Sequence, residues 1–219
     1  MSRPKIAILA SGSGTTAEAF IVAGAAGKIE AQVGLVICSK KSAGIFDRVE
    51  RLNSEYGLNI KCVHIGKENY PDSSDEENAI LNMLSTEEFD LIALMGYMRK
   101  IGPNIVSKYG WRSNYTSPYQ AMMLNTHPGL LPESAGMYGR NVQQYTLDSN
   151  LSFGGQTLHV VSEGYDEGPI IAEHRVPVAP GDTADTLFAK VQDTEKKYLS
   201  EDIDNFIKTR VEYLKGDKK

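Results

Sequence analysis

Short apolar runs alternate with longer polar segments through the first half of the chain. The apolar runs cover residues 6–10, 33–38, 60–65 and 90–95. Continuous apolar runs of this length are typical of strands that are buried on both faces of a parallel sheet. The intervening segments predict helices at residues 15–27, 43–55 and 75–85. This alternation predicts an α/β fold with a Rossmann-like, mostly parallel sheet and helices on both faces.

The hydrophobic pattern changes after Gly96. A short helix is predicted at residues 101–109, a loop at 111–120 and a strand that begins at 121–124. Two antiparallel strands follow at 155–161 and 170–178, and a long helix at 182–214. Either Asp182 or Thr183 is expected to cap the long helix. The C-terminal half therefore adds antiparallel strands to the parallel sheet.

Asn125–Pro128, at the end of the apolar run 121–124, is the candidate chemical centre. Strand periodicity places Asn125 and His127 on the same side of the chain. An amide donor and a titratable ring then face one spot. This pair suits a reaction in which an oxygen gains negative charge and a proton must also move.

The turn Gly12–Ala17 has the pattern G-x-G-x-x-A between a strand and a helix. Gly14, Thr15 and Thr16 would offer backbone amides, a helix N-terminus and hydroxyl groups to a phosphate. A dinucleotide site usually has an acidic residue after the second strand, but residues 39–41 read Ser-Lys-Lys. A phosphate monoester is therefore favoured over a nicotinamide cofactor. A tight turn without a ligand is the structural alternative.

Asp166, in the glycine-rich turn between the two late strands, is the candidate third partner. A carboxylate near His127 could orient the ring or take up a proton. A turn aspartate that bonds its own backbone is an equally good interpretation. For His159, which alternates with apolar residues, a structural role is favoured over a place in the site.

Charge and residue usage restrict the expected partners, cellular location and metal content of the protein. The net charge of −5 and the sequence pI of about 5.4 argue against a nucleic-acid partner. The apolar run that ends at Ala10 is too short for a membrane span or a signal-peptide core, so we expect a cytoplasmic protein without a membrane partner. Cys38 and Cys62 are expected to be buried reduced thiols. His64 and His174 lack ligand spacing, and no metal is expected.

Two motifs together resemble the signature of the folate-dependent formyltransferases. The first motif is Asn125-x-His127-Pro128-x-Leu130-Leu131-Pro132, and the second is Asp166-x-Gly168-Pro169. The similarity extends over most of the chain and includes Ser11-Gly12-x-Gly14, Gly96-Tyr97-Met98-Arg99, Val176-Pro177-Val178 and Val191-Gln192-x-x-Glu195.

The resemblance implies formyl transfer from 10-formyltetrahydrofolate to the amine of glycinamide ribonucleotide, in purine biosynthesis. Asn125 would donate a hydrogen bond to the formyl oxygen as it becomes an oxyanion. His127 would help to stabilise the same oxygen and would pass protons. Asp166 would position His127 and, with a water molecule, receive the proton of the attacking amine.

The resemblance also implies two binding regions. Gly14, Thr15 and Thr16 would hold the acceptor phosphate, and Glu195 would contact the ribose hydroxyls or the amine end. The folate would lie against two loops, through Met98, Arg99, Lys100, Ile101, Ser162, Glu163 and Tyr165.

The chain is thus expected to form one formyltransferase domain over residues 1–219. Residues 1–100 would form the phosphate-binding, Rossmann-like half, residues 101–214 the catalytic and folate half, and residues 215–219 a flexible tail. The expected partners are a phosphorylated amine and a reduced folate, and the expected state is a monomer or a homodimer.

Three segments depart from the family pattern. Residues 133–140 lack the histidines that usually follow the first motif, and residues 111–123 form a longer connection than usual. The acidic segment 72–78 lacks an arginine that usually grips the folate tail. An amine such as an amino-sugar nucleotide could therefore replace glycinamide ribonucleotide as the acceptor. The sequence is also compatible with hydrolysis of 10-formyltetrahydrofolate and with ligand binding without turnover.

Overall fold

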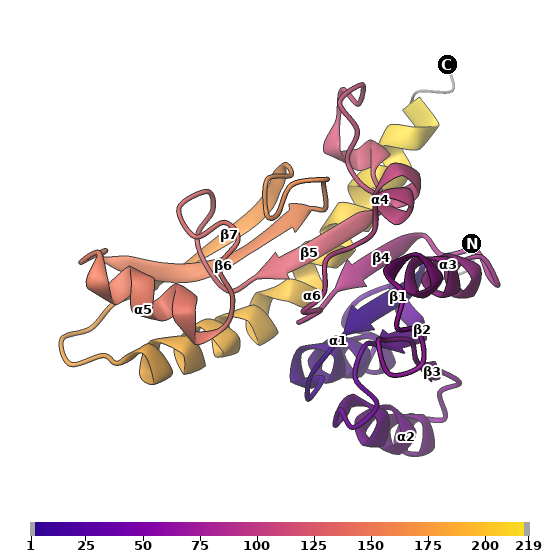
Figure 1. The fold of residues 1–219 in the computed structure, drawn as a ribbon, viewed down its shortest axis with the longest axis horizontal. Helices are drawn as coiled ribbons and strands as arrows, with labels where there is room; N and C mark the ends of the chain where they lie inside the picture. Colours follow the sequence, from indigo (N-terminus) through magenta and orange to yellow (C-terminus); the bar gives the residue numbers. More distant parts are fainter. Residues whose placement is uncertain (1–2, 217–219) are drawn as a thin grey trace.

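The computed structural model describes residues 3–216 and is shown in Figure 1. The strands are β1 (Lys5–Ala10), β2 (Gln32–Cys38), β3 (Lys61–His64), β4 (Leu91–Leu94), β5 (Met123–His127), β6 (Phe153–Val160) and β7 (Ile170–Pro177). The helices are α1 (Thr15–Ala25), α2 (Ile45–Tyr56), α3 (Ser73–Leu84), α4 (Pro103–Tyr109), the 3-10 helix η1 (Pro118–Gln120), α5 (Arg140–Asp148) and α6 (Ala184–Gly216). The strands form one sheet in the order β3–β2–β1–β4–β5–β6–β7. Strands β1 to β5 are parallel, β6 is antiparallel to β5, and β7 is antiparallel to β6.

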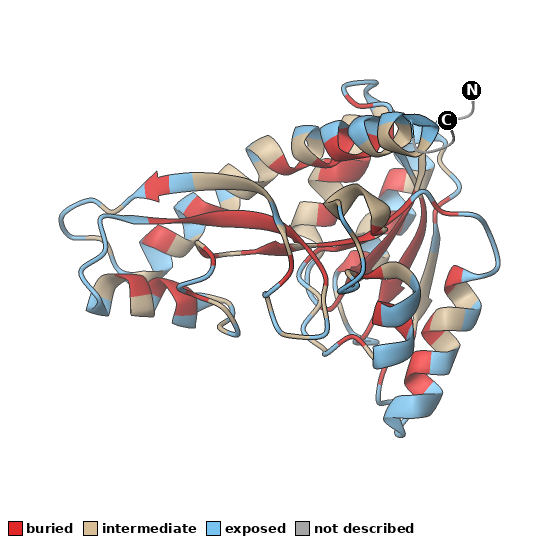
Figure 2. Cartoon of the chain, turned by 90° about the horizontal axis from the view of Figure 1, so that it is seen from above, coloured by how far each residue is buried: buried red, intermediate tan, exposed pale blue. Residues whose placement is uncertain are grey.

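The sheet separates two layers of core side chains. Along β1, Ile6 and Ile8 belong to the layer shared with α1, α2 and the C-terminal half of α6. Ala7 and Leu9 belong to the layer shared with α3 and α4. Figure 2 shows the central strands of the sheet in red, as buried, along most of their length. The continuous apolar runs follow from burial on both faces, and the predicted fold class is confirmed.

The long C-terminal helix begins close to its predicted start. Thr183 precedes α6, and its Oγ1 accepts a hydrogen bond of 3.2 Å from the backbone nitrogen of Thr186. The helix continues through Gly216, so it includes the first two residues of the predicted flexible tail. Residues 217–219 lie outside the described part of the chain. No helix among residues 3–216 has the length and apolar composition needed to cross a membrane.

Helix α5 was not predicted from the sequence. Gly139 precedes it with a φ of 56° and provides no side-chain cap. The buried residues of α5 are Val142, Gln143 and Thr146, of which only valine is apolar. A helix without a cap signal or an apolar stripe is not detected by hydrophobic periodicity.

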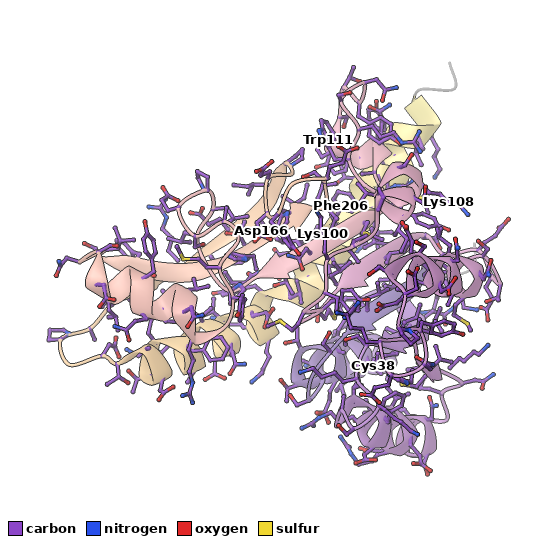
Figure 3. The ribbon with its side chains drawn as sticks, viewed as in Figure 1. Cys38, Lys100, Lys108, Trp111, Asp166 and Phe206 are labelled. Carbon is purple, nitrogen blue, oxygen red and sulfur yellow. The ribbon has the colours of Figure 1, made fainter. Side chains whose placement is uncertain are left out.

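The long connection at residues 111–123 packs against α6. Its predicted loop contains η1, and the ring of Tyr119 lies 5.2 Å from that of Phe206 in α6. Arg210 of α6 donates a hydrogen bond of 3.0 Å to the carbonyl of Ala121. Figure 3 shows Trp111 and Phe206 in this part of the molecule. The connection precedes β5, so it lies at the opposite end of that strand from His127.

Candidate active site

Two loops and the end of a strand meet at the carboxyl edge of three adjacent parallel strands, β1, β4 and β5. The loop after β1 carries Gly14, the loop after β4 carries Met98, and β5 ends at His127. Ser11 connects the first two loops, because its Oγ accepts a hydrogen bond of 2.9 Å from the Met98 backbone nitrogen. The same Oγ lies 2.6 Å from the hydroxyl of Ser39. Carboxyl edges of this kind are the usual ligand sites of open α/β sheets.

Asp166 brings the candidate catalytic residues together. Its Oδ2 lies 3.4 Å from Nδ1 of His127. Its Oδ1 accepts a hydrogen bond of 3.3 Å from Nδ2 of Asn125. The carboxylate comes from the β6–β7 loop, whereas the amide and the ring come from β5; Figure 3 labels Asp166 near β5. The three side chains form one cluster, and their chemical roles stay predictions.

The backbone around Asp166 has two unusual positions. Asp166 itself has a φ of 57°, in the left-handed region that aspartate tolerates better than most residues. A β-carbon on Gly168 would lie 1.7 Å from the carbonyl oxygen of Val160, so no side chain fits there. The backbone nitrogen of Gly136 donates a hydrogen bond of 3.0 Å to Oδ2 of Asp166. These constraints direct the carboxylate toward β5.

His159 joins the cluster, although the sequence favoured a structural role for it. It pairs with Asn125 across the β5–β6 ladder, and its Nε2 lies 3.0 Å from Nδ2 of that residue. The same Nε2 lies 3.3 Å from Oδ1 of Asp166. The structure thus places His159 in the site, the alternative that the sequence disfavoured. Cross-strand register was the missing information, because an alternating strand does not reveal which partner it faces.

The pKa values of both ionisable partners are lowered, for different physical reasons. Burial lowers the pKa of His127 below its ordinary 6.5, against the opposing attraction of Asp166. Burial raises the pKa of Asp166, but the His159 hydrogen bond, the nearby His127 and the Gly136 amide outweigh it and hold that pKa below its usual value. At neutral pH the pair is therefore an ionised carboxylate beside a neutral imidazole, and both groups are in the form that can accept a proton.

The segment 133–140 contributes to the site although it departs from the family pattern. The Ser134 hydroxyl lies 2.9 Å from Nε2 of His127. Tyr138 is 61% exposed, and Arg140 forms an exposed ion pair of 2.6 Å with Asp185. Sequence reasoning did not identify Ser134, because a serine in a turn carries no chemical signature.

The glycine turn is positioned by close packing against α2. Gly14 has a φ of 77°, and a β-carbon there would lie 2.6 Å from the side chain of Ile45. Helix α1 begins at the next residue, Thr15. The first amides of any α-helix have no partner within the helix, so this turn presents donors suited to an anion.

Glu195 of α6 connects the glycine turn to β5. It accepts a hydrogen bond of 2.9 Å from the hydroxyl of Thr16 and one of 2.7 Å from the hydroxyl of Thr126. Burial raises the pKa of Glu195, while the two threonine hydroxyls oppose this rise. The hydroxyl of Thr16 is therefore already engaged, whereas the sequence predicted it only as a phosphate ligand.

Three of the predicted folate-binding residues are exposed at the same place. Met98 and Tyr165 are 54% and 56% exposed. The ammonium group of Lys100 lies 5.5 Å from the centre of the Tyr165 ring. The loops after β4 and β6 therefore touch each other, and Figure 3 labels Lys100 close to Asp166.

The other four predicted folate-binding residues differ from these three in their partners or their burial. Arg99 forms an ion pair with Glu76 of α3, which compensates its charge. Ile101 is buried in the core with 8% exposure, so its side chain does not face a ligand. Ser162 donates a hydrogen bond of 3.2 Å within its own turn. Glu163 is exposed on the same loop.

Within residues 3–216, no group of three or more His, Cys, Asp or Glu side chains is arranged to hold a metal ion. A cavity of about 650 Å³ lies at the amino ends of β1 and β4 and is lined in part by Lys5, Asp90 and Arg210. It lies at the opposite edge of the sheet from the Asp166 cluster.

Comparison with known proteins places this geometry in a family. The formyl transferase family model matches residues 4–203. A phosphoribosylglycinamide formyltransferase of Bacillus subtilis is 30% identical over 194 residues, which cover 89% of this chain and 90% of that protein.

Two crystal structures show the same arrangement of elements. A glycinamide ribonucleotide transformylase from Symbiobacterium toebii has 29% identity and a TM-score of 0.81, covering 95% of this chain and 89% of its own. A phosphoribosylglycinamide formyltransferase from Bacillus halodurans has 32% identity and a TM-score of 0.78, covering 93% and 95%. The family match and the near-complete coverage agree with the two sequence motifs around Asn125 and Asp166. The chain belongs to the formyl transferase family.

Proposed function

We propose that this enzyme transfers the formyl group of 10-formyltetrahydrofolate to the amine of glycinamide ribonucleotide. The contact of Asp166 with both Asn125 and His127 carries this proposal. The relatives named for that reaction, which match over most of their length, support it.

The reaction requires an oxyanion donor and a proton acceptor. The amine nitrogen attacks the formyl carbon, and the carbonyl electron pair moves to oxygen. Asn125 is proposed to donate to that oxygen, in exchange for its 3.3 Å contact with Asp166. Asp166 and His127 are proposed to take the amine proton through a water molecule. They would then return a proton to N10 of the folate as the C–N10 bond breaks. No protein nucleophile is required.

The acceptor is proposed to span the glycine turn and β5. Its phosphate would bind the amides of Gly14, Thr15 and Thr16 at the start of α1. Glu195, which is held by Thr16 and Thr126 between the two elements, would contact the ribose or the amine end. This route leads from the phosphate to Asn125 along the carboxyl edge of the sheet.

The reduced folate is proposed to lie across the loops after β4 and β6. Met98 and Tyr165 offer exposed apolar and aromatic surface, and the Lys100 ammonium group lies beside the Tyr165 ring, next to Asp166 in the chain. Arg99, Ile101 and Ser162 would contribute chiefly through backbone groups and loop shape, because their side chains are paired, buried or bonded within their own turn. Glu163 is exposed on the second loop and could contact the folate directly. The ion pair of Arg99 with Glu76 positions the first of these loops on α3.

Release of tetrahydrofolate from 10-formyltetrahydrofolate tests the function. Release that requires glycinamide ribonucleotide supports the proposal, and release without any acceptor indicates a hydrolase. Release only with an amino-sugar nucleotide would indicate another acceptor. No release from a protein that still binds the folate would indicate a binding protein and refute catalysis.

A further inference from the structure

Ser134 makes two hydrogen bonds in a closely packed position behind His127. Its Oγ lies 2.7 Å from the carbonyl oxygen of Leu130 and 2.9 Å from Nε2 of His127. Ser134 is 3% exposed, as is His127. A β-carbon on Gly129 would lie 2.2 Å from this Oγ, so the absence of a side chain there makes room for the hydroxyl.

The two distances determine where the hydrogens lie. Two oxygen atoms 2.7 Å apart require a hydrogen between them, and a carbonyl oxygen has none to offer. The Ser134 hydroxyl therefore donates to Leu130. Its oxygen is left to accept, so Nε2 of His127 must carry the hydrogen in their 2.9 Å contact.

This assignment leaves Nδ1 of a neutral His127 without a proton. Nδ1 lies 3.4 Å from Oδ2 of Asp166, and the ionisable groups that face the ring are Asp166 and His159. Proton uptake at Nδ1 would convert this close approach into a hydrogen-bonded ion pair. The unprotonated ring nitrogen, Nδ1, thus faces the carboxylate of Asp166.

We propose that Ser134 is a positioning residue that holds the His127 proton on Nε2 and keeps Nδ1 free as a proton acceptor beside Asp166. Its kinetic consequence rests on the proposed function. When the amine forms its bond to the formyl carbon, the nitrogen loses one proton. The Asp166–Nδ1 pair takes that proton, and N10 of the folate receives one when the C–N10 bond breaks, so protons balance over the cycle.

Loss of the Ser134 hydroxyl changes which nitrogen is protonated. In Ser134→Ala the Nε2 hydrogen would be buried without an acceptor, which is costly. Neutral His127 avoids this cost by moving its proton to Nδ1, where Asp166 accepts it. The imidazolium form cannot avoid it, so the pKa of His127 falls in the variant.

Nitrogen-15 NMR of histidine-labelled protein tests the assignment without any substrate. The His127 signals are identified by their loss in His127→Gln. We expect the Nε2-protonated tautomer in the wild type and in Glu133→Ala, an exposed neighbour that serves as the control. We expect the Nδ1-protonated tautomer in Ser134→Ala. The Nδ1 tautomer in the wild type, or an unchanged spectrum in Ser134→Ala, would overturn the proposal.

Steady-state kinetics test the consequence for the reaction. Ser134→Ala should lower kcat at least about tenfold, with little change in KM, and should move the acidic limb of the pH profile to lower pH. Ser134→Thr, which keeps the hydroxyl, should recover part of kcat. An unchanged kcat and pH profile in Ser134→Ala would refute a positioning role. If the wild type transfers no formyl group but shows the Nε2 tautomer, the proposed function fails while the assignment stands.

Discussion

The side-chain amide nitrogen of Asn125, Nδ2, lies 3.3 Å from Oδ1 of Asp166, although the two residues belong to different elements. Asn125 is in the middle of β5, and Asp166 is in the loop that joins β6 to β7. The antiparallel ladder sets Asn125 opposite His159, and the loop then folds back over this pair. The contact therefore depends on two strands and a turn that are distant along the chain.

Replacement of Asn125 by alanine should remove the proposed oxyanion donor. We expect kcat to fall by about 10²–10³-fold, because one preorganised donor contributes that much to such reactions. Tetrahydrofolate release measures the effect, and thermal unfolding of the same sample checks the fold. His127→Ala should also lower kcat by orders of magnitude, and near-wild-type turnover in either variant would contradict the assignment.

The lowered pKa of His127 predicts a pH dependence of stability. The unfolded chain binds the proton before the folded one, so the contribution is fully present above the ordinary value of 6.5. The free energy of unfolding should then decrease as pH falls from 6.5 toward the lowered folded value. Urea unfolding across this window measures the slope. His127→Gln should reduce it, and Glu133→Gln should leave it unchanged.

Gly168→Ala should disturb the loop that holds Asp166. The added β-carbon would meet the carbonyl oxygen of Val160 at 1.7 Å, so the backbone must move. We expect a loss of about 1–3 kcal/mol in the free energy of unfolding, as for other overpacked sites, together with a lower kcat. Gly216→Ala is the matched control, because a β-carbon there meets nothing within 4 Å. Equal effects of the two changes would contradict this prediction.

Glu195→Ala should weaken binding of the acceptor. The hydroxyls of Thr16 and Thr126 would lose their common acceptor, so the hydrogen-bonded link between the glycine turn and β5 would be lost. We expect the KM for glycinamide ribonucleotide to rise about tenfold and the free energy of unfolding to fall by about 1–3 kcal/mol. Asp193→Ala, at an exposed position of the same helix, should change neither quantity. A rise in KM confined to the folate would contradict the proposed acceptor route.

Tyr119→Ala should reduce stability without reducing kcat. The ring packs on Phe206 of α6, at the opposite end of β5 from the candidate catalytic residues. We expect a loss of about 2 kcal/mol in the free energy of unfolding, measured in urea, because partly buried aromatic packing is removed. Tyr138→Ala, at a 61% exposed position, provides a control for stability. A large loss of kcat in Tyr119→Ala would instead indicate a functional role for the long connection.

The parallel half of the fold and the identity of the central polar residues can be predicted from the sequence alone. Runs such as residues 6–10 are apolar throughout because β1 is covered on both faces, and this pattern can be recognised in the sequence. The motifs around Asn125 and Asp166 were equally readable, because their residue types and order are specific. Helix α5 was not, since only Val142 of its buried residues is apolar.

Which side chains meet depends on how the strands and loops pack in the folded chain. His159 enters the cluster through the β5–β6 register, which a single strand does not encode. Ser134 reaches His127 because Gly129 leaves space for its hydroxyl, and Arg99 turns away to Glu76. Local patterns specify elements through periodicity, whereas contacts between distant side chains depend on how those elements pack. The candidate catalytic residues could therefore be identified in the sequence, whereas the contacts that surround them are seen only in the folded chain.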